Sequence, residues 1–355
     1  MIRADFLQDL GIVHPIMQAP MSGGATTPQL VAAVCNAGVL GSLGAAYLAP
    51  DQIASDIKAI RALTDRPFNI NLFAGGYTAQ SQVDPKPMLA ILAEIHDALG
   101  LPAPALPSWP PNSFNEQLEV VLNARPAVFS FTFGIPDPDA LARLRRRGIR
   151  IVGTATTAKE GRRLDESGVT AIVAQGAEAG GHRGTFVDSF ESSMIPTLAL
   201  VQSICNETAT PVIASGGLMD GREIAKAFAS GAVAAQLGTA FLTTAESGIS
   251  ESYKRALLDL RTDTTTITRA FSGRPARGLA NKFTARLAAN EEIILPFPLQ
   301  NTLTRPMRNA AAKLGNTDFQ SLFAGQGASR TRFVSAATLI RNLVVELEHA
   351  LSASA

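Results

Sequence analysis

The stretch best suited to chemistry is residues 172–186, IVAQGAEAGGHRGTF. It begins inside a short apolar run, residues 169–174, of the kind that forms a buried parallel strand, and three glycines follow between positions 176 and 181. Histidine has the side-chain pKa closest to neutrality, so His182 at the end of this loop is a candidate for proton transfer. A lone histidine can also cap a neighbouring element or bond a carbonyl, and both roles are open from this segment alone.

The apolar runs that must position this loop predict the fold. They begin near residues 15, 39, 68, 127, 149, 170, 211 and 233. Helical patterns lie between them, at 28–36, 50–63, 115–123, 137–147, 157–166, 194–206 and 220–229. Pro28, Pro50, Asp137 and Asp220 suit helix starts. Eight continuously apolar strands alternating with helices indicate an α/β fold, a (β/α)₈ TIM barrel, with a doubly wound parallel sheet as the alternative.

The chain is longer than one barrel requires. A typical barrel takes about 250 residues, and this chain has 355. We expect a barrel over residues 1–242, a smaller and mainly helical lid over 243–323, and a segment over 324–355 that packs back on the barrel. Within the lid, residues 251–260 have a helical pattern, 264–269 are strand-like and 272–275 form a turn. The last helix is expected from residue 332 to about 351. A proline- and alanine-rich excursion over 75–111 is expected to cross the barrel mouth, although it could be an inert surface loop.

Composition excludes several classes of partner. A net charge of +1 does not indicate binding to nucleic acid or to an anionic membrane. The uncharged stretch 30–49 is interrupted by glycines, which argues against a membrane span, and no signal peptide is evident. Cys35 and Cys205 lack metal-ligand spacing, so we expect no metal site and reduced thiols in a cytoplasmic protein. We expect the protein to be a monomer or a homodimer.

Two glycine-containing segments follow the last two strands, where (β/α)₈ barrels commonly bind phosphate. Residues 214–218 read ASGGL, and residues 236–240 read QLGTA. Glycine lets backbone N–H groups approach phosphate oxygens. Two such loops at the two expected positions predict a phosphate site.

Other chemistries lack their motifs. The sequence has no G-x-G-x-x-G after a strand, no Walker loop, no G-x-S-x-G elbow and no H-E-x-x-H. His14, His96 and His349 lie away from the carboxyl ends of the predicted strands, which leaves His182 as the histidine placed to act. Phosphosugar isomerases and synthases remain compatible with these features.

Several segments together resemble the FMN-dependent nitronate monooxygenases, formerly called 2-nitropropane dioxygenases. They are residues 174–184 (AQGAEAGGHRG), 18–22 (QAPMS), 67–73 (PFNINLF), 215–217 (SGG), 236–239 (QLGT), 272–278 (SGRPARG) and 324–326 (AGQ). The resemblance spans the barrel and continues into the lid. FMN-dependent enoyl-thioester reductases share the histidine segment.

The resemblance implies a set of cofactor-binding residues. Those lining or bonding the flavin would be Ala19, Pro20, Met21, Asn71, Gln175, Gly180 and Gly181. Those around its phosphate would be Ser215, Gly216, Gly217, Gln236, Leu237, Gly238 and Thr239. Glu178, in the same loop as His182, receives no role.

The activity that the resemblance implies is oxidation of an alkyl nitronate by dioxygen, on FMN, to a carbonyl compound and nitrite. His182 would orient the nitronate, or act as a base if a neutral nitroalkane is accepted. Two alternatives stay open: an NAD(P)H-dependent FMN reductase acting on an enoyl thioester or quinone, and a barrel that binds a phosphate ligand without flavin.

Overall fold

A ring of eight parallel strands forms the centre of the computed structural model, which describes residues 2–75 and 82–353. The strands are β1 (Ile16–Gln18), β2 (Gly41–Gly44), β3 (Phe68–Phe73), β4 (Val128–Thr132), β5 (Arg150–Ala155), β6 (Ala171–Gln175), β8 (Val212–Ser215) and β9 (Ala234–Leu237). Their order is β1-β9-β8-β6-β5-β4-β3-β2, and a parallel bridge between Met17 and Leu40 brings β1 back to β2. The predicted barrel is confirmed, and the doubly wound alternative is wrong.

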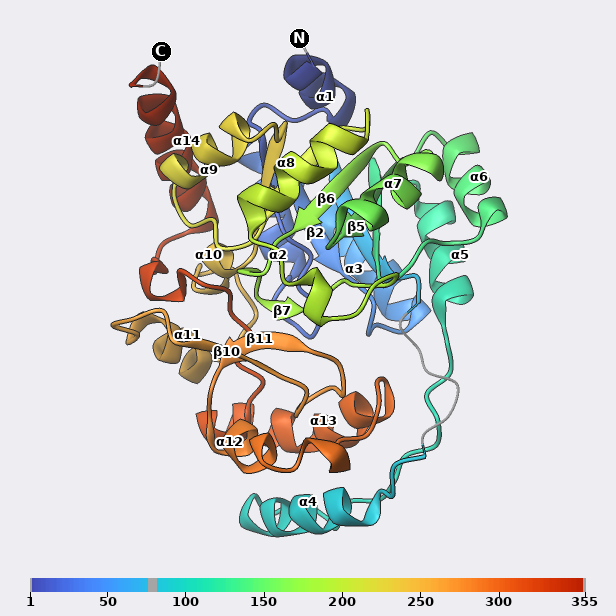
Figure 1. The fold of residues 1–355 in the computed structure, drawn as a ribbon, viewed down its shortest axis with the longest axis vertical. Coiled ribbons are helices and arrows are strands. Elements are labelled where there is room, and N and C mark those ends of the chain that lie inside the picture. The colour runs from blue at the N-terminus through green and yellow to red at the C-terminus, as the bar shows by residue number, and fades with distance from the viewer. Residues whose placement is uncertain (1, 76–81, 354–355) are drawn as a thin grey trace.

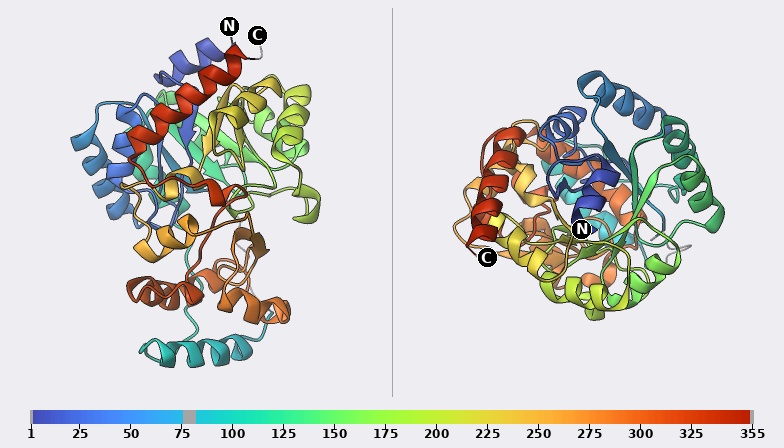
Figure 2. Two further views of the ribbon diagram at one scale, coloured as in Figure 1. Left: turned by 90° about the vertical axis from the view of Figure 1, so that its left-hand side faces the viewer. Right: turned by 90° about the horizontal axis from the view of Figure 1, so that it is seen from above.

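The inside of the barrel changes from apolar to polar along the strands. At the amino end, Met17, Val152 and Ile213 pack against Phe6 and Leu10 of helix α1 (Ile2–Leu10), which closes that end (Figure 2, right). Towards the carboxyl end, the buried side chains include a polar set: Ser42, Asn69, Asn71, Ser130, Thr154 and Ser215. Apolar filling at one end and polar filling at the other leave the carboxyl end suited to a polar ligand.

Seven helices surround the strands near their predicted positions: α2 (Pro28–Asn36), α3 (Pro50–Leu63), α5 (Phe114–Ala124), α6 (Pro138–Arg146), α7 (Ala158–Glu166), α8 (Thr197–Glu207) and α9 (Gly221–Ala229). Asp137 and Asp220 cap α6 and α9, accepting from the backbone N–H groups of Ala140 and Glu223 at 2.8 and 2.9 Å. Helix α8 begins three residues later than predicted, because the residue before Pro196 is disfavoured from helical geometry.

The eighth barrel helix comes from the end of the chain. Only a single turn, α10 (Thr239–Leu242), follows β9 directly. Helix α14 (Ala336–Ser352) instead packs on the barrel exterior against α9 and α2 (Figure 2, left). Its start at Ser335, whose hydroxyl accepts from the Thr338 N–H, is later than the predicted residue 332. Most of the second body is therefore an insertion between the last strand and the last helix of the barrel.

That second body, the lower subdomain, lies against the carboxyl end of the barrel (Figure 1). It contains α4 (Lys86–Ala98), α11 (Glu251–Leu258), β10 (Thr265–Thr268), β11 (Ala276–Leu279), α12 (Lys282–Ala288) and α13 (Leu299–Lys313). Short 3₁₀ turns are η1 (Glu191–Ser193), η2 (Glu291–Ile293), η3 (Thr317–Phe319) and η4 (Ala328–Arg330). The strand-like segment predicted at 264–269 corresponds to β10, and the helix predicted at 251–260 corresponds to α11.

The excursion over 75–111 differs from its expectation. Residues 76–81 lie outside the described part of the chain. Beyond them, α4 packs Met88, Leu92 and Ile95 into the core of the lower subdomain beside Phe271 and Phe283. Part of the segment expected to cross the barrel mouth as a loop is therefore a helix in the core of the lower subdomain. The alternative, an inert surface loop, is wrong for this part. The flanking prolines obscured its i, i+4, i+7 apolar spacing.

None of the described helices is both long and apolar enough to cross a membrane.

The packing of α14 on the barrel gives a test of the fold. Leu343 is fully buried on this helix, and Val345, two residues on, is 45% exposed. Leu343→Ala should lower the free energy of unfolding by about 2–5 kcal/mol, because it leaves a cavity between helices. Val345→Ala, the control, should change it by less than about 0.5 kcal/mol. Urea denaturation followed by far-UV circular dichroism measures both, and equal effects would contradict the assigned packing.

Candidate active site

A cavity of about 630 Å³ lies at the carboxyl end of the barrel, between the strands and the lower subdomain. All fifteen residues singled out from the sequence line it: Ala19, Pro20, Met21, Asn71, Gln175, Gly180, Gly181, His182, Ser215, Gly216, Gly217, Gln236, Leu237, Gly238 and Thr239. They come from the ends of five strands and the loops that follow, and parallel strands bring these ends together.

The glycine loops after β6 and β8 are packed too closely for side chains. Gly217 has φ +69°, and a Cβ there would lie 2.9 Å from the Cβ of Glu178. A Cβ on Gly180 would lie 2.4 Å from the backbone nitrogen of Gly325. Gly325 in turn donates to the Thr239 hydroxyl at 2.9 Å. The two loops and the segment at 324–326 thus form one close-packed rim of exposed backbone.

The loop carrying His182 is held from both sides. Its end forms the two-residue strand β7 (Gly181–His182), which pairs antiparallel with β11 of the lower subdomain. On the barrel side, the Gln175 side chain donates to the His182 carbonyl at 3.0 Å and accepts from the Gly184 N–H at 2.8 Å. Gln175 therefore positions the histidine loop in addition to lining the cavity.

The charged neighbours of His182 in this loop have structural roles. Arg183 is 1% exposed and donates to the carbonyls of Gly176, Gln175 and Ser193. The Glu178 carboxylate, which received no role from the sequence, accepts from the backbone N–H and hydroxyl of Thr197 at 2.9 and 2.6 Å. Pro196, the N-cap residue of α8, has no side-chain acceptor, and the Glu178 carboxylate takes that role.

His182 is half-buried and neutral. Its Nε2 lies 2.8 Å from the Ser272 hydroxyl, in the predicted turn of the lower subdomain, and its ring lies edge-on to Phe133 and Phe323. Burial, and then the positive charges of Arg274 and Arg308, lower its pKa from 6.5 to about 3. Ser272 engages one ring nitrogen, so the other is available to a ligand.

Part of the cavity wall comes from residues outside the predicted strand-end segments and was not identified from the sequence. It comprises the aromatic rings of Tyr47, Phe73, Phe133 and Phe323, and Asn301, Arg305, Arg308 and Asn309 of α13. Polar residues at 301, 305 and 308 repeat at helical spacing, and that pattern could have identified the stripe. No aspartate or glutamate occurs among the described residues that line the cavity.

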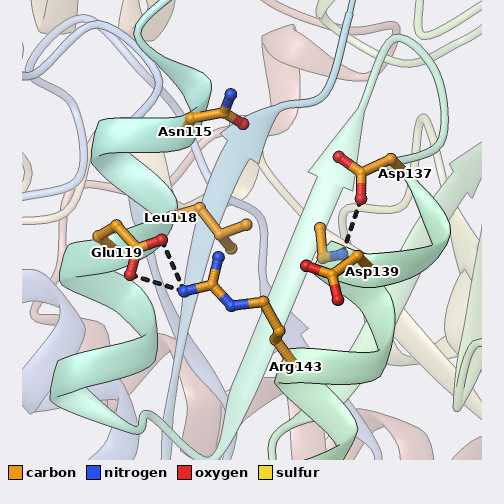
Figure 3. Close-up of a pocket in the computed structure, with 7 residues that line it drawn as sticks. Asn115, Leu118, Glu119, Asp137, Asp139 and Arg143 are labelled. Carbon is orange, nitrogen blue, oxygen red and sulfur yellow. Dashed lines mark hydrogen bonds and ion pairs between the residues drawn. The ribbon is translucent and has the colours of Figure 1, made fainter.

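A second, smaller cavity of about 280 Å³ lies between α5 and α6 on the barrel exterior (Figure 3). Its charged groups are already engaged: Arg143 pairs with Glu119 at 2.6 Å, and Asp137 caps α6. Over residues 2–75 and 82–353, no group of three His, Cys, Asp or Glu side chains could hold a metal ion. The cavity around His182 is therefore the candidate active site.

An eight-stranded α/β barrel with a ligand cavity at the carboxyl ends of its strands is the architecture of a barrel enzyme. A family model described as nitronate monooxygenase matches residues 4–346. Relatives include a nitronate monooxygenase from Paraburkholderia phytofirmans, 43% identical over 96% of this chain and 94% of that protein. A probable nitronate monooxygenase from Staphylococcus saprophyticus is 36% identical over 94% and 95%.

Two solved structures share the fold of this chain. The nitroalkane oxidase from Streptomyces ansochromogenes superimposes with a TM-score of 0.91 at 41% identity, covering 99% of this chain and 100% of that one. FabK from Thermotoga maritima superimposes with a TM-score of 0.77 at 26% identity, covering 99% and 97%. The chain belongs to the nitronate monooxygenase family, and it is an oxidoreductase. The predicted family is confirmed.

The lowered pKa of His182 gives a stability test. Between pH 6.5 and about 3 the unfolded chain binds a proton at His182 that the folded chain does not, so stability is lost as pH falls through that window. From pH 7 to 5 this loss should reach at most about 2 kcal/mol. His182→Asn removes it, so the variant should lose less stability than the wild type over that range. Urea denaturation at both pH values measures the difference; parallel losses would mean that His182 titrates normally.

Proposed function

We propose that this protein oxidises alkyl nitronates with dioxygen to a carbonyl compound and nitrite, using FMN. The observation that carries the proposal is the single cavity that gathers the predicted flavin residues, the glycine loops and His182. Membership of the nitronate monooxygenase family supports the reaction class.

The cavity suits a mononucleotide. Its volume lies within the range of about 300–1,000 Å³ typical of small-molecule sites. Gly217 would present backbone to the phosphate, and Ala19 and Met21 would line one face of the flavin ring. The sequence carries no adenosine-binding motif, which favours FMN over FAD. The chemistry that bound FMN supplies is electron transfer from the substrate and reaction with dioxygen.

The remaining residues position the substrate. Because burial and two nearby cationic side chains lower the pKa of His182 to about 3, it is a weak base and is poorly matched to remove a proton from a neutral nitroalkane. It can instead hold a nitronate, which has already lost that proton, by a hydrogen bond. The aromatic rings of Phe73 and Phe133 offer an apolar wall to the alkyl group. The lower subdomain, residues 243–323 with α4, would act as a lid that excludes water.

Gly217 tests the phosphate site. The wild type should carry about one FMN per chain, and Gly217→Ala should weaken FMN binding by about tenfold or more, because the new Cβ displaces the adjoining loop. Gly148→Ala is the matched control: its φ of +71° imposes similar backbone strain, but no atom lies within 4 Å of the added Cβ. Fluorescence titration of the apoprotein with FMN measures the affinities, and equal dissociation constants in the two variants would place the phosphate elsewhere.

Anaerobic reduction of the flavin separates the proposed activity from the alternatives. An alkyl nitronate should bleach the flavin absorbance much faster than NADH or NADPH, which stopped-flow spectrophotometry measures. Faster bleaching by a nicotinamide would favour the flavin reductase acting on an enoyl thioester or quinone. A colourless protein that binds no FMN would favour the flavin-free phosphate barrel.

A further inference from the structure

Helix α13 brings an unsatisfied guanidinium to the wall of the cavity. Arg308 donates from one terminal nitrogen to the backbone and side-chain oxygens of Asn301, at 2.7 and 3.0 Å. Its Nε is enclosed and has no hydrogen-bond partner. Among the described residues Asn301 alone accepts from Arg308, so the other terminal nitrogen of the guanidinium remains for a ligand.

No counter-ion balances this charge. None of the described cavity-lining residues is acidic, and Arg308 forms no ion pair with any residue that the structure describes. The other arginine of the wall, Arg305, is exposed and lies over the ring of Tyr47 at 5.3 Å, so its charge is solvated. Burial lowers the pKa of Arg308 to about 10, which leaves it cationic at neutral pH. A half-buried cation without a counter-ion is costly, and an anionic ligand would offset that cost.

The neighbours of Arg308 favour the space left for the substrate as the place of that anion. The cation-π contact of Arg305 with Tyr47, which follows β2, places this part of α13 over that side of the barrel. In the strand order β2 lies two strands from β9 and three from β8, whose loops would hold the phosphate. Arg308 is also close enough to act electrostatically on His182. It therefore faces the space left for the substrate.

We propose that Arg308, oriented by Asn301, is the residue that binds the substrate's negative charge and selects a nitronate over its neutral nitroalkane. This inference rests on the proposed function. A nitronate shares its negative charge between two oxygens, either of which can accept a charge-assisted hydrogen bond from the terminal nitrogen that Asn301 leaves free. A neutral nitro group has the same shape but no net charge. The site thus discriminates between two protonation states of one molecule.

The test uses Arg308→Met, which removes the charge and keeps most of the side-chain length. Arg286→Met is the control, because Arg286 is an exposed residue of the lower subdomain that pairs with Glu94 on the surface. The value of kcat/KM for ethyl nitronate should fall about 10- to 150-fold in Arg308→Met. The kcat/KM for neutral nitroethane, or its inhibition constant if it is not turned over, should change by less than about threefold. Arg286→Met should leave both values near those of the wild type.

Nitrite, a planar anion with two oxygens, provides a readout without turnover. Sodium nitrite should raise the Tm of the protein as purified above its value in sodium chloride of equal ionic strength. Arg308→Met should abolish this difference, and Arg286→Met should retain it. Equal losses on nitronate and nitroethane, or an unchanged nitrite shift in Arg308→Met, would overturn the proposal.

The two readouts separate this inference from the proposed function. A wild type that binds nitrite through Arg308 but does not oxidise nitronates would contradict the function and leave the anion site standing. A wild type that oxidises nitronates while Arg308→Met keeps its selectivity would contradict the anion site alone.

Should Arg308→Met fail to fold, Arg308→Lys and Arg308→Gln decide the question. Lysine retains the charge and should preserve more of the selectivity for nitronate than glutamine, which retains only hydrogen bonding. Equal selectivity in these two folded variants would overturn the role of the charge.

Discussion

The pairing of β7 with β11 is the interaction on which the site depends. Strand β7 is only two residues long, and its partner belongs to an insertion that begins after the last barrel strand. This pairing fixes the backbone of His182 to the lower subdomain, and the Ser272 hydroxyl then holds the imidazole itself. Without the pairing, the histidine would lie on a glycine-rich loop free to adopt many conformations. The barrel forms one side of the cavity, and this small sheet positions the lower subdomain, which forms the other side.

Buried arginines give this junction its rigidity and its charge. Arg274 donates to the carbonyls of Arg183 and Thr185, and its guanidinium lies 3.9 Å from the centre of the Phe133 ring. Arg277 of β11 donates to the Ala177 carbonyl at 3.0 Å, which ties the lower subdomain to the same loop. These hydrogen bonds satisfy carbonyls that a glycine-rich loop cannot pair within itself. Burial of His182, together with the positive charges of Arg274 and Arg308, disfavours the protonated form of its imidazole.

The parts of the structure that local sequence determines were predictable. Apolar runs and helix caps such as Asp137 and Asp220 act within a few residues, so the strands and barrel helices could be located, and parallel strands necessarily gather their loops at one end. The spacing at 301, 305 and 308 marks a polar stripe on α13, but its approach to the cavity was not predictable, because that depends on long-range packing against α4. The neutral state of His182 was hidden for the same reason: Arg274 and Arg308 are near it only in the folded chain.

The cavity has arginines but no carboxylate among its described lining residues, and this sets its chemical character. A base that removes a proton from carbon must then hold that proton, and a histidine whose pKa is lowered to about 3 by burial and by Arg274 and Arg308 is too weak a base for this. The same surroundings stabilise a ligand that arrives already negative. With no carboxylate among its described lining residues, the cavity favours an anion and disfavours a proton. A substrate deprotonated in solution before binding therefore fits this electrostatic environment, and under the proposed function the protein's task would be to hold that anion against the cofactor and to exclude water.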